Sequence, residues 1–302
     1  MVKKKILIFS NNLGYFFSHR EPLIPFLKKL NWEIVLVHGN PGSKKIDNQY
    51  VSKIKKYKIK SKQINMDSSF VNIKKELFSI ISLYKFIKKT NPTLLHTISP
   101  KANLYGGIIS LLFKFKLVIS VSGLGSLQSS RFKFLYIIYN FLLKVIFLKK
   151  NLNVIFHNKS DLNFYKKKFN LNKNQLILTH GSGIDLKNYN YNYNYRNKKI
   201  LFAGRILKSK GVEDFIIAAN ILKKKIPDWQ FLIAGTTDYT NPDSISISDL
   251  KKKIINNKNI KYLGYVKNNV SLYKDVGIYC LPSYSEGLSK TLLEASASGV
   301  PV

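Results

Sequence analysis

Short apolar runs of four to six residues alternate with longer amphipathic segments along most of this chain. Such runs, when rich in Ile, Leu and Val, are typical of strands buried on both faces of a parallel sheet, and the amphipathic segments between them are typical of crossover helices. In the first part of the chain this pattern predicts helices at residues 21–30, 73–89 and 160–169. It predicts strands at residues 6–10, 33–38, 94–98, 117–121, 153–157 and 175–178.

A low-complexity tract at residues 187–199, in which Asn and Tyr alternate, interrupts this pattern. Such a tract supports neither a helix face nor a core strand, so we interpret it as a linker between two domains. The pattern then resumes, with predicted helices at 212–225 and 289–298 and predicted strands at 199–203, 230–234, 260–263 and 277–281. We therefore expect two tandem doubly wound, Rossmann-like α/β domains, at residues 1–186 and 200–302. Ligands are expected at the carboxyl ends of the strands.

The formal net charge of +34 bears on the partners of the protein. A basic protein gains affinity for any polyanion by counterion release, but no zinc spacing, helix-turn-helix pattern or aromatic RNA-binding signature accompanies the lysines. Because the basic residues are spread over the whole chain, we expect no specific nucleic-acid partner. We expect attraction to an anionic membrane surface instead, where each nearby Lys contributes about 1 kcal/mol. Solvated lysines without a function are the alternative for most of these positions.

Cysteine content and the start of the chain bear on the compartment. Cys280 is the only cysteine, which excludes an intramolecular disulfide, and no leader sequence precedes the first predicted strand. We expect a cytoplasmic protein that is peripherally associated with the inner face of the cytoplasmic membrane.

Residues 131–150 form a long apolar segment that could be mistaken for a membrane span. Lys133 and Lys144 interrupt the stretch of about 20 apolar residues that a span needs. At about 100° per residue, these lysines fall with Asn140 and Asn151 on one narrow polar stripe of a helix. We expect this helix mainly to pack within the domain, with some exposure at a membrane surface as the alternative.

The most specific motif is the run at residues 285–301, which follows the predicted strand at 277–281. Gly287 allows a tight turn into a helix that begins near Leu288 or Ser289, and the free amides at a helix start form a ready phosphate site. Glu286 lies in the loop before these amides, and Glu294 lies about two turns along the helix. The two carboxylates are expected at different ends of one ligand, where they suit hydroxyl recognition better than proton transfer.

A second motif surrounds Gly204 and Arg205, directly after the predicted strand at 199–203. A glycine after a strand permits close approach of a ligand to the backbone. Arg205 and Lys210 are two cations five residues apart that can converge on a diphosphate, the first through its planar fork and the second as a point charge. A solvated arginine and a lysine near a helix start are the alternative.

Together, the Glu-Gly and Glu-Ala elements before Gly-Val-Pro-Val resemble the signature of family 4 of the retaining glycosyltransferases, which have GT-B architecture. By that resemblance, Glu294 holds the ribose hydroxyls of a nucleotide and Glu286 contacts the donor sugar. Arg205 and Lys210 neutralise the leaving nucleoside diphosphate. Gly204, Gly287, Leu288 and Ser289 complete the donor site.

The N-terminal half resembles bacterial transferases of this family that add a hexosamine to polyprenyl-diphosphate-linked sugars. The resemblance lies in the segments at residues 11–23, 96–106 and 120–126. It implies a donor contact at Gly14, a catalytic or ligand contact at His96, and acceptor contacts at His19, Arg20 and Lys101. Capping, solvation or hydrogen bonding to neighbouring backbone is the alternative for His96 and for the three acceptor residues.

These features predict a retaining glycosyltransferase that moves a hexosamine or hexose from a UDP-sugar to a lipid-linked saccharide. No metal or other cofactor is expected, because the protein's own cations and a helix dipole face the diphosphate. A sugar-nucleotide 2-epimerase of the same architecture and a noncatalytic polyanion-binding protein are the alternatives. The family pattern continues beyond Val302, so the second domain is expected to be truncated.

Overall fold

The computed structural model describes residues 4–302 except 41–43, 68–72, 122–132, 190–196, 238–240, 242, 267–268 and 285. The chain forms two compact units, Met1–Ser182 and Gly183–Val302. The linker predicted at 187–199 lies within the second unit, and its residues 190–196 are outside the described part.

The first unit is built on a seven-stranded parallel sheet with the order β3-β2-β1-β4-β5-β6-β7. Most strands are apolar on both faces, which is the pattern of a parallel sheet covered by helices on each side. The strands are β1 (Lys5–Ser10), β2 (Glu33–His38), β3 (Lys60–Gln63), β4 (Leu94–Thr97), β5 (Lys116–Val121), β6 (Leu152–Phe156) and β7 (Leu176–Leu178).

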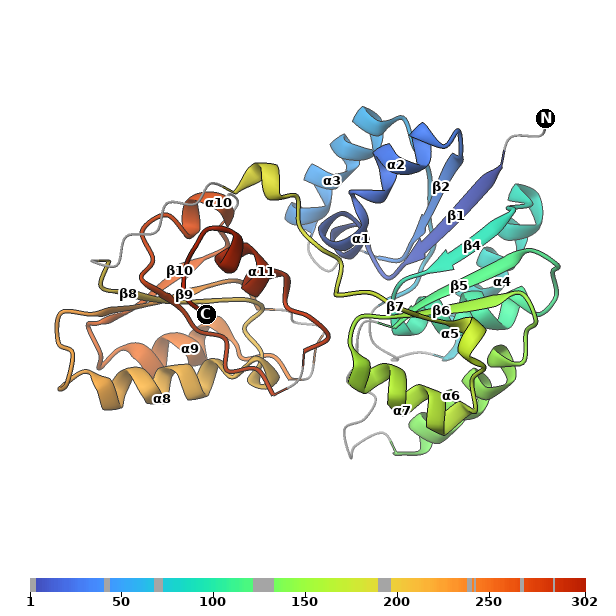
Figure 1. Ribbon diagram of the computed structural model, residues 1–302. Coiled ribbons are helices and arrows are strands. Elements are labelled where there is room, and N and C mark those ends of the chain that lie inside the picture. The colour runs from blue at the N-terminus through green and yellow to red at the C-terminus, as the bar shows by residue number, and fades with distance from the viewer. Residues whose placement is uncertain are drawn as a thin grey trace. The chain divides into compact units, whose positions relative to one another are not determined.

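Helices cover both faces of this sheet (Figure 1). On one face lie α1 (Leu13–Arg20), α2 (Leu23–Lys29) and α3 (Lys44–Tyr57). On the other lie α4 (Ile73–Thr90), α5 (Pro100–Ser110), α6 (Lys133–Phe147) and α7 (Lys159–Phe169).

Local sequence signals set several of these helix ends. The Asn158 side chain caps α7 by accepting from the backbone amide of Asp161 at 2.7 Å, and Asn170 ends the helix in a left-handed conformation with φ of 50°. Pro100 occupies the first turn of α5, where its missing amide hydrogen is not needed.

The second unit is a four-stranded parallel sheet with the order β10-β9-β8-β11. Its strands are β8 (Lys199–Ala203), β9 (Gln230–Ala234), β10 (Ile260–Gly264) and β11 (Ile278–Tyr279). One face packs against α8 (Val212–Leu222) and α9 (Ile247–Ile254), and the other against α10 (Asn269–Leu272) and α11 (Lys290–Ala297) (Figure 1). Two Rossmann-like α/β units are therefore present, as the alternation predicts.

The structure corrects the predicted elements near the N-terminus. The helix predicted at residues 21–30 corresponds to α2 alone, and the pattern misses α1, which ends at Arg20 just before Pro22 separates the two helices. The sequence pattern also misses α3 and β3, whose residues Lys60–Gln63 are all exposed. The helix predicted to start near Leu288 or Ser289 starts at Lys290, with Ser289 as its cap.

Candidate functional site

The loop after β8 carries the predicted phosphate-binding residues Gly204, Arg205 and Lys210. Two backbone amides fix this loop to the segment at Asp243: Ser209 N donates to a carboxylate oxygen of Asp243 at 2.8 Å, and Lys208 N donates to its carbonyl at 3.0 Å. Gly204 N donates to the carbonyl of Ala234 on β9 at 3.0 Å. Arg205 is exposed on this loop, and Lys210 is partly exposed at the end of the 3₁₀-helix Lys208–Lys210.

Gly211 brings this loop against the loop that follows β11. Its φ is +71°, and a Cβ atom on it would lie 1.9 Å from the carbonyl oxygen of Pro282, so no larger residue fits without a shift. The same two loops are joined by the amide of Tyr284 and the hydroxyl of Ser283, which both donate to the Ser209 carbonyl, at 3.0 and 3.1 Å. The ends of β8 and β11 are thereby held side by side.

This packing brings Lys210 and Glu286 together. The Lys210 ammonium donates a hydrogen bond to Oε1 of Glu286, and both side chains remain partly exposed. Gly287 and Leu288 continue the loop from Glu286 toward the start of α11, and Leu288 is exposed. Ser285, the first residue of the motif, lies outside the described residues.

Hydroxyl groups tie the start of α11 to the carboxyl end of β8. The Ser289 hydroxyl caps the helix by accepting from the amide of Leu292 at 3.4 Å, and it lies 2.9 Å from Oγ1 of Thr291. The Tyr279 hydroxyl lies 2.6 Å from the same Thr291 oxygen and donates to the carbonyl of Ala203 at 3.1 Å. Burial raises the pKa of Tyr279, so its hydroxyl stays protonated.

Glu294 is buried, with 1% of its surface exposed. The Tyr273 hydroxyl donates to its Oε2 at 3.2 Å, Lys290 lies 3.6 Å from its Oε1, and Tyr189 forms a further side-chain hydrogen bond to it. Burial, followed by the charge of Glu294, raises the pKa of both tyrosines. This carboxylate is thus surrounded by hydrogen-bond donors, whereas Glu286 is solvent-accessible.

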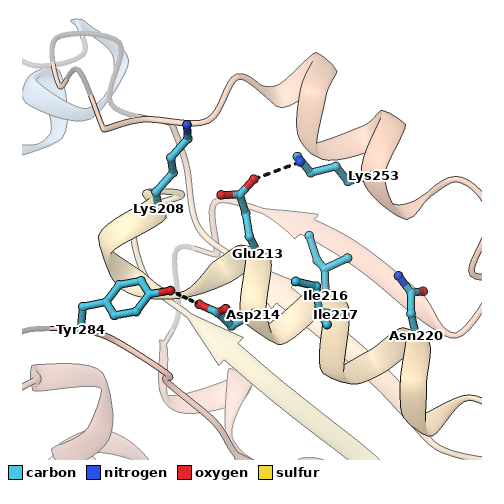
Figure 2. Close-up of a pocket in the computed structure, with 8 residues that line it drawn as sticks. All are labelled: Lys208, Glu213, Asp214, Ile216, Ile217, Asn220, Lys253 and Tyr284. Carbon is cyan, nitrogen blue, oxygen red and sulfur yellow. Dashed lines mark hydrogen bonds and ion pairs between the residues drawn. The ribbon is translucent and has the colours of Figure 1, made fainter.

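A cavity of about 640 Å³ beside the start of α8 shares these loops but not the predicted site residues (Figure 2). In it, Tyr284 donates to Asp214 at 2.8 Å, and Lys253 forms an ion pair with Glu213 at 2.9 Å. Its acidic groups already have partners on the protein. Lys208 lines this cavity, whereas Lys210, two residues further along the chain, does not.

In the first unit, Arg20 and two histidines form a buried cluster. Nη2 of Arg20 lies 3.0 Å from Nε2 of His157, and Nδ1 of His157 lies 3.1 Å from the Thr179 hydroxyl. His96 Nε2 lies 2.9 Å from the hydroxyl of Ser120. Burial and then the Arg20 charge lower the pKa of His96 to about 3 and that of His157 to about 4. Both imidazoles are therefore neutral near pH 7, and Nε2 of His157 accepts from Arg20.

The remaining predicted residues of the first unit lie elsewhere. Lys101 is 2% exposed and pairs with Glu76 at 2.5 Å, an arrangement that favours a structural role over acceptor binding. Gly14 lies inside α1 and not in a loop, and a Cβ atom there would make only ordinary contacts at 3.5 Å. His19 is half-buried, with Nδ1 2.6 Å from the Ser18 hydroxyl. Residues 122–126 of the third resembling segment lie outside the described part.

Sequence reasoning misses His157, Tyr189 and Tyr273 as neighbours of the site. His157 follows β6 and His96 lies on β4, two strands of the same parallel sheet with β5 between them. Because the carboxyl ends of parallel strands share one edge, the end of each predicted strand is a usable signal. Tyr273 carries no such signal, because its contact with Glu294 depends on the packing of α10 against α11.

The described residues form neither a metal cluster nor a membrane-spanning helix. No group of three or more His, Cys, Asp or Glu side chains there is arranged to hold a metal ion. In the same residues, no helix has the length and apolar character of a membrane span.

Comparison with known proteins decides the family. Residues 187–302 match the family described as glycosyl transferases group 1, and residues 5–180 match the family described as glycosyl transferase 4-like. The second match spans more than half of the chain. The chain belongs to the glycosyl transferase 4-like family. It is therefore a glycosyltransferase.

Two curated relatives of this glycosyltransferase cover most of its chain. The N,N'-diacetylbacillosaminyl-diphospho-undecaprenol alpha-1,3-N-acetylgalactosaminyltransferase of Campylobacter jejuni is 27% identical, over 94% of this chain and 75% of the relative. The UDP-Gal:alpha-D-GlcNAc-diphosphoundecaprenol alpha-1,3-galactosyltransferase of Escherichia coli is 25% identical, over 76% of this chain and 62% of the relative.

A solved structure establishes the fold class of the glycosyltransferase. The crystal structure of Anabaena Alr3699/HepE in complex with UDP matches with a TM-score of 0.72 and 15% identity, over 99% of this chain and 79% of that chain. At this identity the match shows the fold alone, which is the GT-B fold of two Rossmann-like domains.

Proposed function

We propose that this glycosyltransferase moves a hexosamine or hexose from a UDP-sugar to a hydroxyl of a lipid-linked saccharide, with retention of configuration at the anomeric carbon. The donor binds in the second unit, and the acceptor binds in the first. The enzyme works at a membrane surface, where its lipid-linked acceptor resides, in the assembly of a surface polysaccharide or glycan.

The observation that carries this proposal is the contact between Lys210 and Glu286 in front of the start of α11. One is a cation from the loop after β8, and the other is a carboxylate from the loop after β11. A diphosphate that binds the Lys210 ammonium and the amides after Glu286 leaves that carboxylate beside the attached sugar. Both groups lie at the carboxyl ends of parallel strands, where ligands of doubly wound sheets bind.

The negative charge that develops on the departing diphosphate determines which residues we assign to catalysis. The bond from the anomeric carbon to the terminal phosphate oxygen breaks, and its electron pair leaves with the diphosphate. The acceptor oxygen bonds to that carbon, and the proton of the acceptor hydroxyl passes to an oxygen of the departing diphosphate. Preorganised donors at the departing oxygen are therefore expected to contribute most to catalysis. Arg205, Lys210 and the amides after Glu286 would supply them without a metal ion. Glu294 would bind the ribose hydroxyls by exchanging one of its tyrosine partners for the ligand.

The names of the relatives support the choice of substrates. One relative is named for a UDP-galactose donor, and both are named for acceptors linked to undecaprenol through a diphosphate. In the first unit, Arg20 is a buried guanidinium whose described partners are a carbonyl and a neutral imidazole. This cation suits an anionic acceptor better than a neutral one.

Transfer from radiolabelled UDP-sugars to an undecaprenyl-diphosphate-linked saccharide tests the proposal. Arg205→Ala and Lys210→Ala are each expected to lower kcat by about 10²–10³-fold, as loss of a charge-stabilising donor does. Lys208→Ala is the matched control, because Lys208 shares the loop but lines the cavity beside α8. Unchanged transfer in the first two variants would contradict the proposal. Product stereochemistry by NMR tests retention, and thermal shifts with UDP- and GDP-sugars test the base.

A further inference from the structure

The first unit carries an apolar face that no part of the described chain covers. It consists of Leu111, Leu112, Ile137, Phe141, Val145 and Leu148, which we call the α5–α6 face. Leu112, Phe141 and Leu148 are 71%, 65% and 77% exposed. Large apolar side chains exposed in one contiguous group mark a binding surface more often than single exposed residues do.

Helix geometry makes this face continuous along α6 and the turn residue Leu148 that follows it. At about 100° per residue, Ile137, Phe141 and Leu148 fall within about 40° of one another, and Val145 lies beside them. The opposite side of α6 is buried in the core through Tyr139, Leu143 and Ile146. The expected packing of this helix within the domain is thus present. A second apolar side of the helix remains exposed.

Lys149 connects this side of α6 to the end of α5. Its ammonium donates to the carbonyl of Ser110 at 2.8 Å and to that of Phe113 at 2.7 Å. These bonds hold the turn that contains Leu111 and Leu112 next to Leu148. Figure 1 shows α6 in the helical layer beside α7, and contacts of Phe147 with the Tyr165 and Phe169 rings fix that neighbour.

The charge around the face has one sign. Between Glu76 and Asp161 the chain has twelve Lys or Arg residues and no Asp or Glu. At the average acidic content of this chain, a stretch of that length would hold about four acidic residues, so the region departs even from a basic background. Lys144 and Lys150 are exposed next to the apolar side chains, and among the described residues neither forms an ion pair.

We propose that the α5–α6 face binds an anionic membrane leaflet. The inference rests on the proposed function in one respect, because a lipid-linked acceptor requires the enzyme at a membrane. Apolar side chains rimmed by lysines suit insertion about 5–10 Å into the headgroup region, with each lysine adding about 1 kcal/mol against anionic lipid. A protein partner would need an acidic rim, and a second copy of this basic chain would repel the first.

Sedimentation with lipid vesicles tests the proposal on the full 302-residue chain. We expect binding to phosphatidylcholine vesicles that contain phosphatidylglycerol, and about tenfold weaker binding when phosphatidylglycerol is omitted or salt is raised. The variant Phe141→Glu/Leu148→Glu is expected to weaken binding at least about tenfold. Lys144→Glu/Lys150→Glu is expected to remove the preference for phosphatidylglycerol.

The matched control is Ile217→Glu/Ile221→Glu on α8, which changes two side chains of similar exposure, 56% and 63%, in the other unit. It is expected to bind vesicles as the wild type does. Equal vesicle binding by the α6 and α8 variants would overturn the proposal. A wild type that dimerises through this face in light scattering and ignores vesicles would also overturn it.

Thermal unfolding and UDP binding show whether each variant is folded. The readout also separates this inference from the proposed function. A wild type that binds vesicles but neither binds UDP nor transfers sugar would contradict the proposed function alone. A wild type that transfers sugar to a detergent-dispersed acceptor but does not bind vesicles would contradict the α5–α6 face alone.

Discussion

Lys210 and Glu286 stand 76 residues apart in the chain, yet the ammonium of the first donates directly to the carboxylate of the second. The contact is made by two loops that pack through Gly211 and Pro282. Glu286 therefore pairs with the same cation that the diphosphate is proposed to bind. A donor bound as proposed would displace this carboxylate and leave it next to the sugar.

Opposite effects on UDP binding are expected when the two partners are changed separately. Lys210→Ala is expected to weaken UDP binding about tenfold, because one charge-assisted contact is lost. Glu286→Gln removes the competing carboxylate, so UDP binding should stay equal or become tighter, while transfer falls because the sugar contact is lost. Isothermal titration with UDP and steady-state transfer measure the two effects. Equal weakening of UDP binding in both variants would sink the assignment.

The burial of Glu294 leads to a second pair of variants. Glu294→Gln keeps the shape of the side chain but removes its charge, and we expect UDP to bind about tenfold more weakly. Tyr273→Phe keeps the carboxylate and removes one donor to it, which is expected to lower the free energy of unfolding by about 1–2 kcal/mol. Titration and urea unfolding separate the two roles. Wild-type affinity of Glu294→Gln for UDP would show that this carboxylate has only a structural role.

The neutral histidines of the first unit make its stability depend on pH. His96 and His157 have folded pKa values of about 3 and about 4, below the usual 6.5, because burial and then Arg20 disfavour their charged forms. The unfolded chain therefore binds more protons below pH 6.5, and stability is lost as pH falls from there toward these folded values. His38, whose pKa burial also lowers, acts in the same direction.

Acidification from pH 7 to pH 5 is expected to lower the unfolding free energy by about 1–2 kcal/mol for each of His96 and His157. Urea unfolding at several pH values in this range measures the slope of the unfolding free energy against pH. His157→Gln keeps an acceptor for Arg20 but does not titrate, so its slope should be about half as steep if only the pair contributes. A wild type that becomes more stable on acidification is the result that this account excludes.

The buried strands were predictable from sequence, and the exposed edge strand β3 was not. The bounds of β2, β8 and β9 agree with the predicted strands, because strands buried on both faces are apolar throughout. The edge strand β3 reads Lys-Ser-Lys-Gln and is fully exposed, so it has no apolar pattern to detect. Lysines on such an edge discourage pairing with another chain, which explains the composition after the fact.

Motif spacing located the loops of the site but not the state of each side chain. The resemblance implies an acceptor contact at Lys101, but Lys101 is buried and pairs with Glu76, 25 residues earlier. The burial of Glu294 likewise depends on Tyr273 from a different helix. Such pairings are set by tertiary packing, and neither residue type nor spacing along the chain encodes them.

The close approach of Gly211 to Pro282 gives the last prediction, because a second glycine offers a matched control. Gly211 and Gly264 have almost the same φ, +71° and +69°, so Ala at either position costs about 1–2 kcal/mol in the left-handed region. A Cβ atom at Gly264 meets nothing within 4 Å, whereas at Gly211 it meets the Pro282 carbonyl at 1.9 Å. Gly211→Ala must therefore also push the two loops apart.

We expect Gly211→Ala to lower the unfolding free energy by clearly more than Gly264→Ala and to weaken UDP binding, since Lys210 and Glu286 move with those loops. Urea unfolding and UDP titration of both variants measure this difference. Equal losses in the two variants would mean that the contact at Pro282 does not hold the donor site together.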